Sequence, residues 1–332
     1  MELNNIESLG EFEAPSFFKD NGYTVIRIPG IVSLSNGDMI VYYECRRGGD
    51  WSPIDIGMTK SRDGGKTWSE TIIAASGMGR NTMNNPCMIS DGEKVHFFYC
   101  ENYKRLFYSV SVDAGESFSP SKELTDDIDR LSKNRFWSVL ACGPGHGLRL
   151  KDGSLIIPMW FACNKTDMFA HHPSFISVLR IEKGCKELHL SKRIDEGTLV
   201  DPSECCVAET GDGKLVINIR NENKIRRRSL SFSSDGGKNW TDPVFCEDMP
   251  DPVCCAGMCE FGEDILFTNC SSETARENLT LKRFNPSIKH KESLLISSTG
   301  GYSDVCFNPV YGKAFVAFEN ETNHIKIAEI EI

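Results

Sequence analysis

The sequence predicts an all-β fold, a six-bladed β-propeller formed by a single domain that spans residues 1–332. Two observations carry this prediction. An octapeptide with the pattern Ser-x-Asp-x-Gly-x-x-aromatic occurs three times, and a longer unit of apolar strand, glycine-containing turn and apolar strand occurs six times. Repetition of one supersecondary unit at a fixed period is typical of propellers and other repeat folds.

The octapeptide is interpreted as a hairpin turn. Its copies are residues 61–68 (SRDGGKTW) and 233–240 (SSDGGKNW), with a weaker copy at 111–118 (SVDAGESF). The Asp side chain accepts backbone N–H groups inside such a turn, Gly supplies a positive φ, and the aromatic ring covers the turn. We therefore expect Asp63, Asp113 and Asp235 to be structural, on the rim opposite to the binding site.

The longer unit defines the blades. Its turn glycines are Gly37, Gly92, Gly153, Gly213, Gly262 and Gly312. Their spacing, roughly 50–60 residues, is that of four-stranded propeller blades. In chain order, the paired strands are expected at residues 27–32 and 39–43, 86–89 and 95–98, 146–150 and 155–160, 204–208 and 215–219, 253–258 and 265–267, and 305–307 and 314–318.

These strands are almost continuously apolar, which fits blades that are packed on both faces. The octapeptides follow the second strand of a unit, so they are expected to join the third and fourth strands. We expect little helix. A strand near residues 11–18 is expected to pair with the last blade and close the ring. The alternative, a β-sandwich with coincidental turns, does not account for the six-fold regularity.

Charge and chain start limit the partners and the location. The net charge of -10 argues against nucleic acid or an anionic membrane as a partner. The sequence has no apolar run of about 18 residues, which a membrane-spanning helix would need. Its first residues lack the basic and apolar regions of a signal peptide. A cytoplasmic location is therefore expected.

The 14 cysteines are interpreted as reduced thiols. The adjacent pairs at 205–206 and 254–255 lie in apolar, strand-like runs, where they suit small buried hydrophobes. A metal site formed by Cys254, Cys255 and Cys259 is the alternative, but these residues lack the paired spacing of a zinc site. No metal is expected.

Charged residues cluster where the propeller would place its binding mouth. The inner strands of a propeller converge on the axis, and one mouth of this funnel is the usual binding site. In an antiparallel hairpin, the residue before the first strand and the residue after the second lie at the same end. The residues at or near these positions are Arg27, Glu44, Arg46, Asp50, Glu204, Arg220, Arg276 and Tyr302.

This constellation resembles the sialidase (neuraminidase) superfamily, in particular its bacterial-type exo-α-sialidases, over essentially the whole chain. Residues 27–29 match the family's Arg-Ile-Pro motif, and the octapeptides match its Asp-boxes. Residues 44–58 look like the loop that carries the acid/base Asp, residues 143–147 resemble a further family segment, and residues 301–303 look like the nucleophile Tyr segment.

The resemblance implies a substrate with a carboxylate on its anomeric carbon. Arg27, Arg220 and Arg276 would clamp that carboxylate, because a guanidinium matches a planar anion better than Lys does. A carboxylate nucleophile would be repelled by the substrate's own carboxylate, whereas the neutral phenol of Tyr302 would not. Sialidases with a Tyr nucleophile are a known exception to the use of two carboxylates by glycosidases.

The remaining roles follow from the same resemblance. Glu204 would take the proton of Tyr302. Asp50 would protonate the leaving oxygen and then activate water, giving hydrolysis with retention. Asp55, in the same loop, is the alternative to Asp50. No cofactor is implied.

The surrounding residues are expected to bind the rest of the substrate. Arg46 and Glu44 are placed near the substrate hydroxyls or behind the clamp, and Trp51 is expected to wall the pocket. The loops at residues 77–85 and 136–137 are expected to line the N-acyl and glycerol pockets.

The expected function is that of an exo-α-sialidase that releases terminal sialic acid from sialylated oligosaccharides or glycoconjugates. A hydrolase or transferase for a related nonulosonic acid is one alternative. A non-catalytic sialic-acid-binding propeller is another, but it would need only the clamp. A protein-interaction propeller would not need arginines at the mouth. Purely structural roles for Tyr302, Glu204 and Arg220 would leave Asp50 unexplained.

Overall fold

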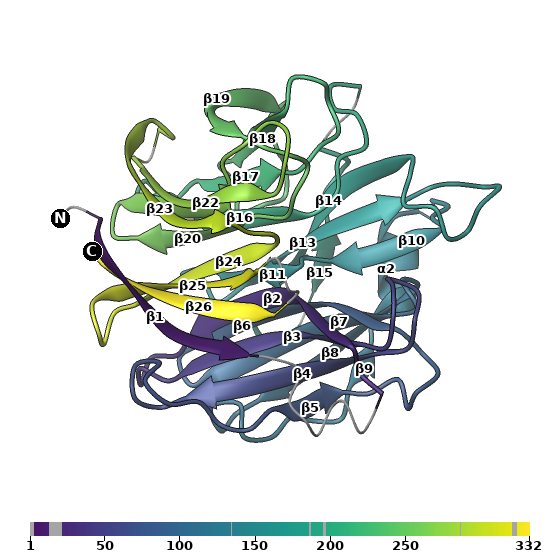
Figure 1. Cartoon of the computed structure of the whole chain (residues 1–332). Helices are drawn as coiled ribbons and strands as arrows, with labels where there is room; N and C mark the ends of the chain where they lie inside the picture. The colour runs from purple at the N-terminus through teal and green to yellow at the C-terminus, as the bar shows by residue number, and fades with distance from the viewer. Residues whose placement is uncertain are drawn as a thin grey trace.

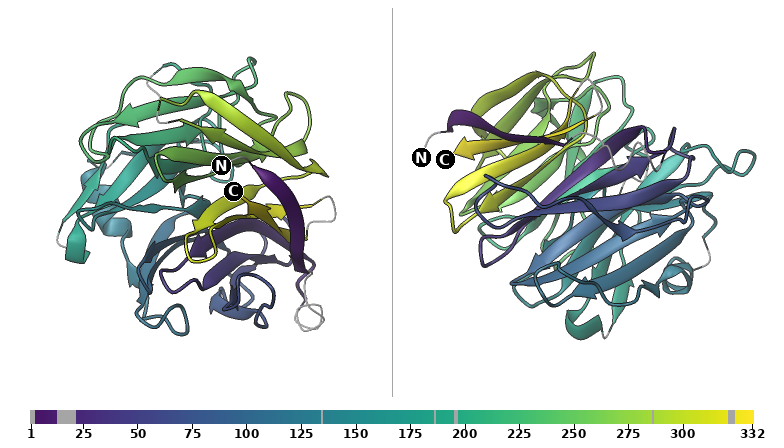
Figure 2. Two further views of the ribbon diagram at one scale, coloured as in Figure 1. Left: turned by 90° about the vertical axis from the view of Figure 1, so that its left-hand side faces the viewer. Right: turned by 60° about the horizontal axis from the view of Figure 1, so that its bottom comes forward.

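The structure is a computed structural model that describes residues 3–12, 22–133, 135–185, 187–194, 197–285, 287–320 and 324–332. These residues form six sheets arranged in a ring around a common axis (Figures 1 and 2). The predicted six-bladed β-propeller is thus confirmed.

The first, fourth and fifth blades are simple meanders of four antiparallel strands. The second blade contains the same meander and one additional strand. The first consists of β2 (Val25–Ser33), β3 (Met39–Arg46), β4 (Ile54–Ser61) and β5 (Ile72–Ala75). The second begins with β6 (Met83–Asp91), β7 (Lys94–Glu101), β8 (Arg105–Ser111) and β9 (Lys122–Glu123). The fourth consists of β16 (Cys205–Glu209), β17 (Leu215–Ile219), β18 (Arg227–Ser233) and β19 (Val244–Pro250). The fifth consists of β20 (Gly257–Phe261), β21 (Asp264–Cys270), β22 (Glu277–Phe284) and β23 (His290–Thr299).

The prediction of a single inner strand at residues 146–150 of the third blade is wrong. β10 (Val139–Cys142) and β12 (Leu148–Arg149) both pair with β13 (Leu155–Ala162), whereas β11 (Gly145–His146) pairs in parallel with β6 of the second blade. The blade is completed by β14 (Ser174–Ile181) and β15 (Leu188–Leu190). Pro144 has no N–H to donate, and Gly143 and Gly145 have φ values of 57° and 90°, so this segment cannot continue a regular ladder.

The fifth blade shows a smaller difference. Its inner strand starts at Gly257, whereas the prediction started it at residue 253. Val253 has a φ of 64°, which is incompatible with a strand. As predicted, the described chain contains little helix, namely α2 (Thr125–Leu131) and the short 3₁₀ turn η1 (Lys183–Cys185).

The ring is closed by a strand from the N-terminal region. β1 (Asn4–Phe12) pairs with β26 (Ile325–Glu331) and completes a sixth sheet with β24 (Ser303–Asn308) and β25 (Lys313–Glu319). Closure is thus confirmed, but the strand lies earlier than the predicted residues 11–18, of which 13–18 fall outside the described residues. The beginning of β1 lies beside the end of β26, since Asn4 pairs with Glu331 (Figure 2).

The hydrophobic core lies between the blades. One apolar cluster fills each contact between neighbouring blades, so six clusters encircle the axis. β3, β13, β14 and β21 are buried along their whole length. Each sheet is therefore fixed by both neighbours, which holds the strand ends that carry the site in place.

The octapeptides form the predicted turns between third and fourth strands. In the first copy, Thr67 N donates to Asp63 Oδ1 at 2.9 Å and Trp68 Nε1 donates to Gly65 O at 2.9 Å. Gly64 and Gly65 have positive φ. The other copies join β8 to β9 and β18 to β19.

Two further predictions concern membranes and thiols. Within the described ranges, no helix is both long and apolar enough to cross a bilayer. The cysteines that the structure describes are all free, and most are buried. Burial raises the pKa of the Cys206 thiol to about 12, so this thiol is protonated at neutral pH.

Candidate active site

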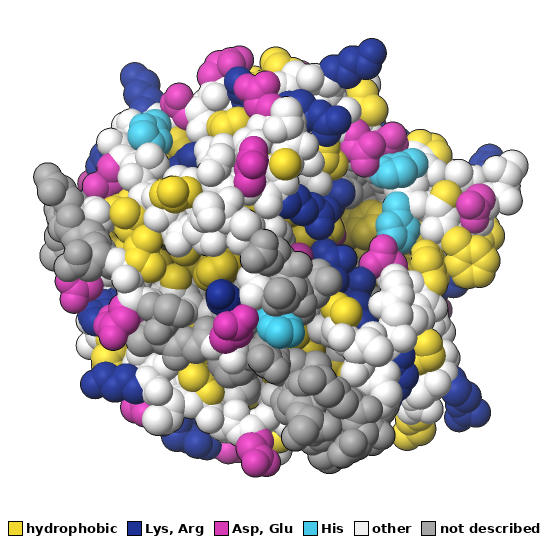
Figure 3. All heavy atoms as spheres, viewed as in Figure 1, with side chains coloured by type: hydrophobic (Ala, Val, Ile, Leu, Met, Phe, Trp, Pro, Cys, Tyr) yellow, Lys and Arg dark blue, Asp and Glu magenta, His cyan; other side chains and the backbone are white. Residues whose placement is uncertain are grey.

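A polar cavity of about 190 Å³ opens at one mouth of the propeller axis. It lies at the ends where inner strands begin and second strands finish, away from the octapeptide turns. In Figure 3, basic, acidic and histidine side chains surround one hollow of this face. The lining residues are Arg27, Ile28, Glu44, Arg46, Asp50, Asn85, Tyr103, Trp160, His171, His172, Ser203, Glu204, Arg220, Arg276 and Tyr302.

Eight of the nine predicted site residues lie together in this cavity, and Trp51 does not line it. The Trp51 ring instead packs behind the wall, 4.7 Å from the ring of Tyr103 and 5.8 Å from that of His171. Asp55 also points elsewhere: it accepts hydrogen bonds from Tyr23 Oη and, at 2.6 Å, from Gly77 N. The geometry therefore favours Asp50 over Asp55 as the carboxyl group that faces a ligand.

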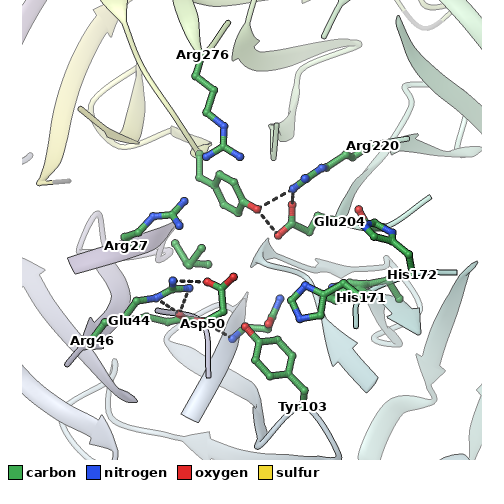
Figure 4. A pocket seen from close by; sticks show the side chains of 15 residues that line it. Arg27, Glu44, Arg46, Asp50, Tyr103, His171, His172, Glu204, Arg220 and Arg276 are labelled. Atoms are coloured by element: carbon green, nitrogen blue, oxygen red, sulfur yellow. Dashed lines mark hydrogen bonds and ion pairs between the residues drawn. The ribbon is translucent and has the colours of Figure 1, made fainter. Parts of the chain in front are cut away.

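Tyr302, Glu204 and Arg220 line the cavity and form one hydrogen-bonded group, of which Figure 4 labels Glu204 and Arg220. Tyr302 Oη donates to Glu204 Oε1 at 2.7 Å and accepts from Arg220 Nη1 at 2.7 Å. Arg220 also forms an ion pair with Glu204. Burial raises the pKa of Tyr302 well above its ordinary value, although Arg220 acts in the opposite direction. The phenol is therefore neutral and already touches a carboxylate that can accept its proton.

Three arginines surround the Tyr302 ring. The guanidinium carbons of Arg27, Arg220 and Arg276 lie 5.1, 5.9 and 5.2 Å from its centre. Arg27 forms two hydrogen bonds with Glu319, of 3.0 and 3.1 Å. The guanidinium of Arg276 has no ion pair within the part of the chain that the structure describes. The cavity thus has a cationic side with capacity for an anion.

Glu319 is a positioning residue that the sequence analysis missed. Besides Arg27, its carboxylate accepts the backbone N–H groups of Ile28, at 2.9 Å, and Tyr302, at 3.1 Å. It ties the first blade to the sixth at the point where their inner strands begin. Its position directly after the second apolar run of the sixth unit is the same signal that identified Glu44 and Arg220, so the sequence could have revealed it.

Asp50 is held by the buried Arg46, whose other partner is the buried Glu44. Arg46 Nη1 donates to Asp50 Oδ1 at 2.5 Å, and Arg46 Nη2 lies 2.6 Å from Glu44 Oε2. Glu44 also accepts Asn85 N at 2.8 Å. Partial burial raises the pKa of Asp50, but the charge and hydrogen bond of Arg46 outweigh burial, so the net shift is downward. In this state Asp50 is ionised at neutral pH.

The wall of the second and third blades contains residues that the sequence analysis did not identify, namely Tyr103, Trp160, His171 and His172. Trp160 and Tyr103 lie at or near the ends of second strands, so the rule used for the charged residues would have included them. His171 and His172 lie in the long loop between β13 and β14, where no repeated pattern marks a position.

The two predicted substrate loops have different outcomes. Asn85, at the end of residues 77–85, lines the cavity. The loop at 136–137 does not: the Trp137 ring packs 5.6 Å from Phe161 in the core between the second and third blades. That part of the prediction is wrong, because α2 and its connection fold against the outer part of the blades.

One cluster of side chains near the rim of the cavity consists of residue types that can bind a metal ion. Among the described residues, His172, Asp201 and Glu222 bring their candidate ligand atoms within 4.8 Å of one another. His172 Nε2 lies 3.3 Å from Glu222 and Nδ1 lies 3.8 Å from Asp201. These contacts are those of a histidine between two carboxylates, which requires no ion.

Comparisons with known proteins address the family and the fold of the chain. The profile of the BNR repeat-like domain matches residues 37–309. The chain is 24% identical over 304 residues to a "Sialidase" of Bacteroides fragilis, an alignment that covers 79% of this chain and 53% of the relative. The chain thus spans about half the length of that curated relative.

Solved structures share the fold. "Hadza microbial sialidase Hz136" superposes with a TM-score of 0.81 at 23% identity, covering 94% of this chain and 67% of that one. The intramolecular trans-sialidase from Ruminococcus gnavus superposes with a TM-score of 0.77 at 14% identity, covering 97% and 96%. At such identities the likeness establishes the propeller fold.

Proposed function

The chain belongs to the BNR repeat-like domain family and to the sialidase superfamily, and from this premise we propose that it is a retaining exo-α-sialidase acting on sialylated oligosaccharides or glycoconjugates. The observation that carries the proposal is the contact of Tyr302 Oη with Glu204, at 2.7 Å, inside a ring of three arginines.

The arginines provide the substrate's anchor. A sialoside carries a carboxylate on its anomeric carbon, and guanidinium groups bind such an anion through paired charged hydrogen bonds. Arg276, which is unpaired within the described part of the chain, supplies a cation directly. The anchor places the anomeric carbon beside Tyr302, since all three guanidinium groups surround that ring.

The phenol of Tyr302 is the proposed nucleophile. Glu204 accepts its proton as the oxygen attacks the anomeric carbon and the glycosidic bond breaks. A neutral nucleophile avoids repulsion by the substrate carboxylate. The positive charge of Arg220 next to Tyr302 Oη stabilises the phenolate character that develops during the attack.

Asp50 is the proposed acid and base. It gives a proton to the departing glycosidic oxygen, then removes one from the water that attacks the sugar–tyrosine bond. Two displacements at one carbon return the original configuration. Because Arg46 favours the ionised form of Asp50, the first step is expected to be fastest at acidic pH.

The test is release of 4-methylumbelliferone from its α-N-acetylneuraminide by the wild type, Tyr302→Phe and a control, Tyr99→Phe. Tyr99 is a buried tyrosine whose hydroxyl bonds Ser121 away from the cavity. We expect the wild type and the control to turn over, and Tyr302→Phe to lose about 10³-fold or more. Full activity of Tyr302→Phe would refute the nucleophile assignment.

The product distinguishes the neighbouring reactions. Early NMR spectra that show the α-anomer first would support retention, and the β-anomer would contradict it. The structural neighbours include an intramolecular trans-sialidase, so the mass of the product is also measured by mass spectrometry. A free acid supports hydrolysis, whereas a product lighter by one water would indicate intramolecular transfer.

A further inference from the structure

We propose that Asp304 and His146 are positioning residues, which hold the strand that carries Tyr302 in place through contacts on the propeller axis. These contacts, of Asp304 with His146 and with the backbone of Ile31, are called the axial link. Its catalytic consequence rests on the proposed function. The axial link also gives a role to residues 143–147, a segment singled out in the sequence that is absent from the described lining of the active-site cavity.

The first observation is that one buried carboxylate joins strands of different blades. Asp304 lies on β24 of the sixth blade and is 1% exposed. Its carboxylate accepts Ile31 N of β2 at 3.0 Å, and His146 Nδ1 of β11 donates to it at 2.9 Å to each oxygen. β2, β11 and β24 belong to three different sheets and lie side by side at the centre of the ring (Figure 1). Asp304 therefore connects the first, second and sixth blades at the axis.

The second observation is that each of these blades carries part of the active site near its connection to Asp304. β2 carries Arg27, and β6, which pairs with β11, carries Asn85. Tyr302 directly precedes β24 and extends its pairing with β25, because Glu319 N donates to Tyr302 O at 2.9 Å. Residues two apart on an extended strand project from the same face, so Tyr302 and Asp304 share the face towards the axis. A displacement of β24 at Asp304 would therefore displace the phenol.

The third observation is that the segment carrying His146 is itself fixed. Gly145 has a φ of 90°, a conformation that favours glycine, and a Cβ there would lie 3.4 Å from the carboxyl carbon of Asp304. The fully buried Tyr42 donates its hydroxyl to Gly145 O at 2.9 Å and accepts Met88 N at 3.1 Å. The detour of β11 is thus held by the first and second blades, and it presents the His146 ring to Asp304.

The contact between His146 and Asp304 is an ion pair at mildly acidic pH. Burial lowers the pKa of His146, but the charge and hydrogen bond of Asp304 outweigh it, assisted by the charge of Glu260, so the net shift is upward. Hydrogen bonds between charged groups are stronger than those between neutral groups. Removing one partner leaves the other buried and unpaired, which is strongly unfavourable. Loss of the His146 ring is therefore expected to let Asp304 and its strand shift.

The test compares the wild type with His146→Ala, Asp304→Asn and a control, His96→Ala, at mildly acidic pH. His96 is a matched control, because its side chain is 13% exposed against 14% for His146, it also lies near an Asp, and it is outside the described lining of the active-site cavity. His146 borders a second cavity, of about 360 Å³, at the opposite mouth of the axis. Added imidazole can therefore reach the place of the missing ring without entering the active site.

Three quantities are measured on each full chain. The first is kcat for the fluorogenic sialoside, and the second is the Kd of 2-deoxy-2,3-didehydro-N-acetylneuraminic acid by isothermal titration calorimetry. The third is the ¹⁹F NMR resonance of Tyr302 after labelling with 3-fluorotyrosine, assigned by its loss in Tyr302→Phe. This resonance reports the surroundings of the phenol whether or not the chain has activity.

In His146→Ala and Asp304→Asn we expect kcat to fall by about tenfold to a hundredfold, since a small misplacement of a reacting group has an effect of this size. The Kd should change by less than about threefold, because Glu319 still holds Arg27. The Tyr302 resonance should shift or broaden in both variants and stay in place in His96→Ala. Imidazole should restore kcat and the resonance in His146→Ala but not in Asp304→Asn.

A Tyr302 resonance that stays in place in both variants would overturn the axial link, as would a loss of kcat in His146→Ala that imidazole does not restore. A shifted resonance that imidazole restores, in a chain whose wild type does not turn over the sialoside, would contradict the sialidase proposal and support the axial link. If His146→Ala does not fold, His146→Asn replaces it, because its amide keeps an N–H donor. It should shift the resonance less than Asp304→Asn does, and an equal shift would overturn the proposal.

Discussion

Asp235 and Asp50 carry the same side chain near opposite ends of blade strands. Asp235 is bound within its own octapeptide, by Ser233 Oγ at 2.8 Å, Asn239 N at 2.9 Å and Asn239 Nδ2 at 2.7 Å. Asp50 is bound by Arg46, whose other partner is Glu44, and its second oxygen is left for the cavity.

Both carboxyl groups have a lowered pKa, but for different reasons. Slight burial raises the pKa of Asp235, and the local hydrogen bonds outweigh it to give a pKa of about 2. Partial burial raises the pKa of Asp50, but the charge and hydrogen bond of the buried Arg46 outweigh it, assisted by the charges of Arg27 and His171. A carboxylate satisfied inside its own turn stabilises a fold, whereas one held by a neighbouring charge is available for chemistry.

The largest expected effect separates these two residues by activity. Asp50→Ala should reduce turnover of the fluorogenic sialoside by about 10²-fold to 10⁴-fold, because the leaving group loses its acid. Its free energy of unfolding should change by less than about 0.5 kcal/mol, since Arg46 keeps Glu44 as a partner. Steady-state kinetics and urea unfolding check both halves. Wild-type kinetics in Asp50→Ala would mean that Asp50, like Asp235, takes no part in catalysis.

The clamp gives the next effect. Arg276→Met removes the cation that has no ion pair within the described chain, so the KM for a sialoside should rise by about 10-fold to 100-fold, the range of a hydrogen bond between charged groups. Arg227→Met is the control, because it removes the same charge from a residue that pairs with Glu273 outside the cavity. Equal effects of the two variants would mean that only net charge matters.

A smaller effect concerns pH. The acid must be protonated, so kcat/KM should fall as pH rises through the pKa of Asp50. Glu44→Gln removes a nearby negative charge and should move this fall to lower pH. Arg46→Gln should move it to higher pH, because the group that lowers the Asp50 pKa is lost.

Both variants must also be checked for folding. Arg46→Gln leaves the buried Glu44 without its cation, which destabilises the folded state. Circular dichroism of both variants at each pH separates unfolding from titration. A shift of the fall in kcat/KM in the same direction in both variants would contradict the claim that Arg46 and Glu44 set the pKa of Asp50.

The smallest effect belongs to the octapeptide. Asp235→Ala should lower the free energy of unfolding by about 1 kcal/mol after solvent screening, with unchanged kcat/KM at 25 °C. Because the folded-state pKa is depressed to about 2, this contribution is present above about pH 4. It should disappear as pH falls towards 2, so the unfolding curves of wild type and variant should converge there. A gap that persists at pH 2 would rule out the ionised carboxylate as its source.

The same contrast explains what the sequence could and could not predict. The octapeptides and glycine turns recur, so the number of blades and the mouth at which Arg27, Glu204 and Tyr302 meet follow from spacing. Trp51 failed as a wall residue because neighbours in sequence do not share a direction, and its ring lies behind Tyr103.

Other features lacked a repeated signal. His171 comes from a loop of the third blade alone, so only the folded chain places it beside Asp50 and Trp160. The detour of β11 into the second blade depends on the backbone of residues 143–145, and strand periodicity does not reveal it. The cytoplasmic location stays a prediction.

The most direct measurement of the central claim is trapping of the covalent intermediate. The wild type is incubated with 2,3-difluorosialic acid, digested, and its peptides are sequenced by mass spectrometry. We predict one added fluorosialosyl group, on Tyr302, and none in Tyr302→Phe. An adduct on Glu204 or Asp50, or turnover of the fluorogenic sialoside by a Tyr302→Phe variant at the wild-type rate, would contradict the account.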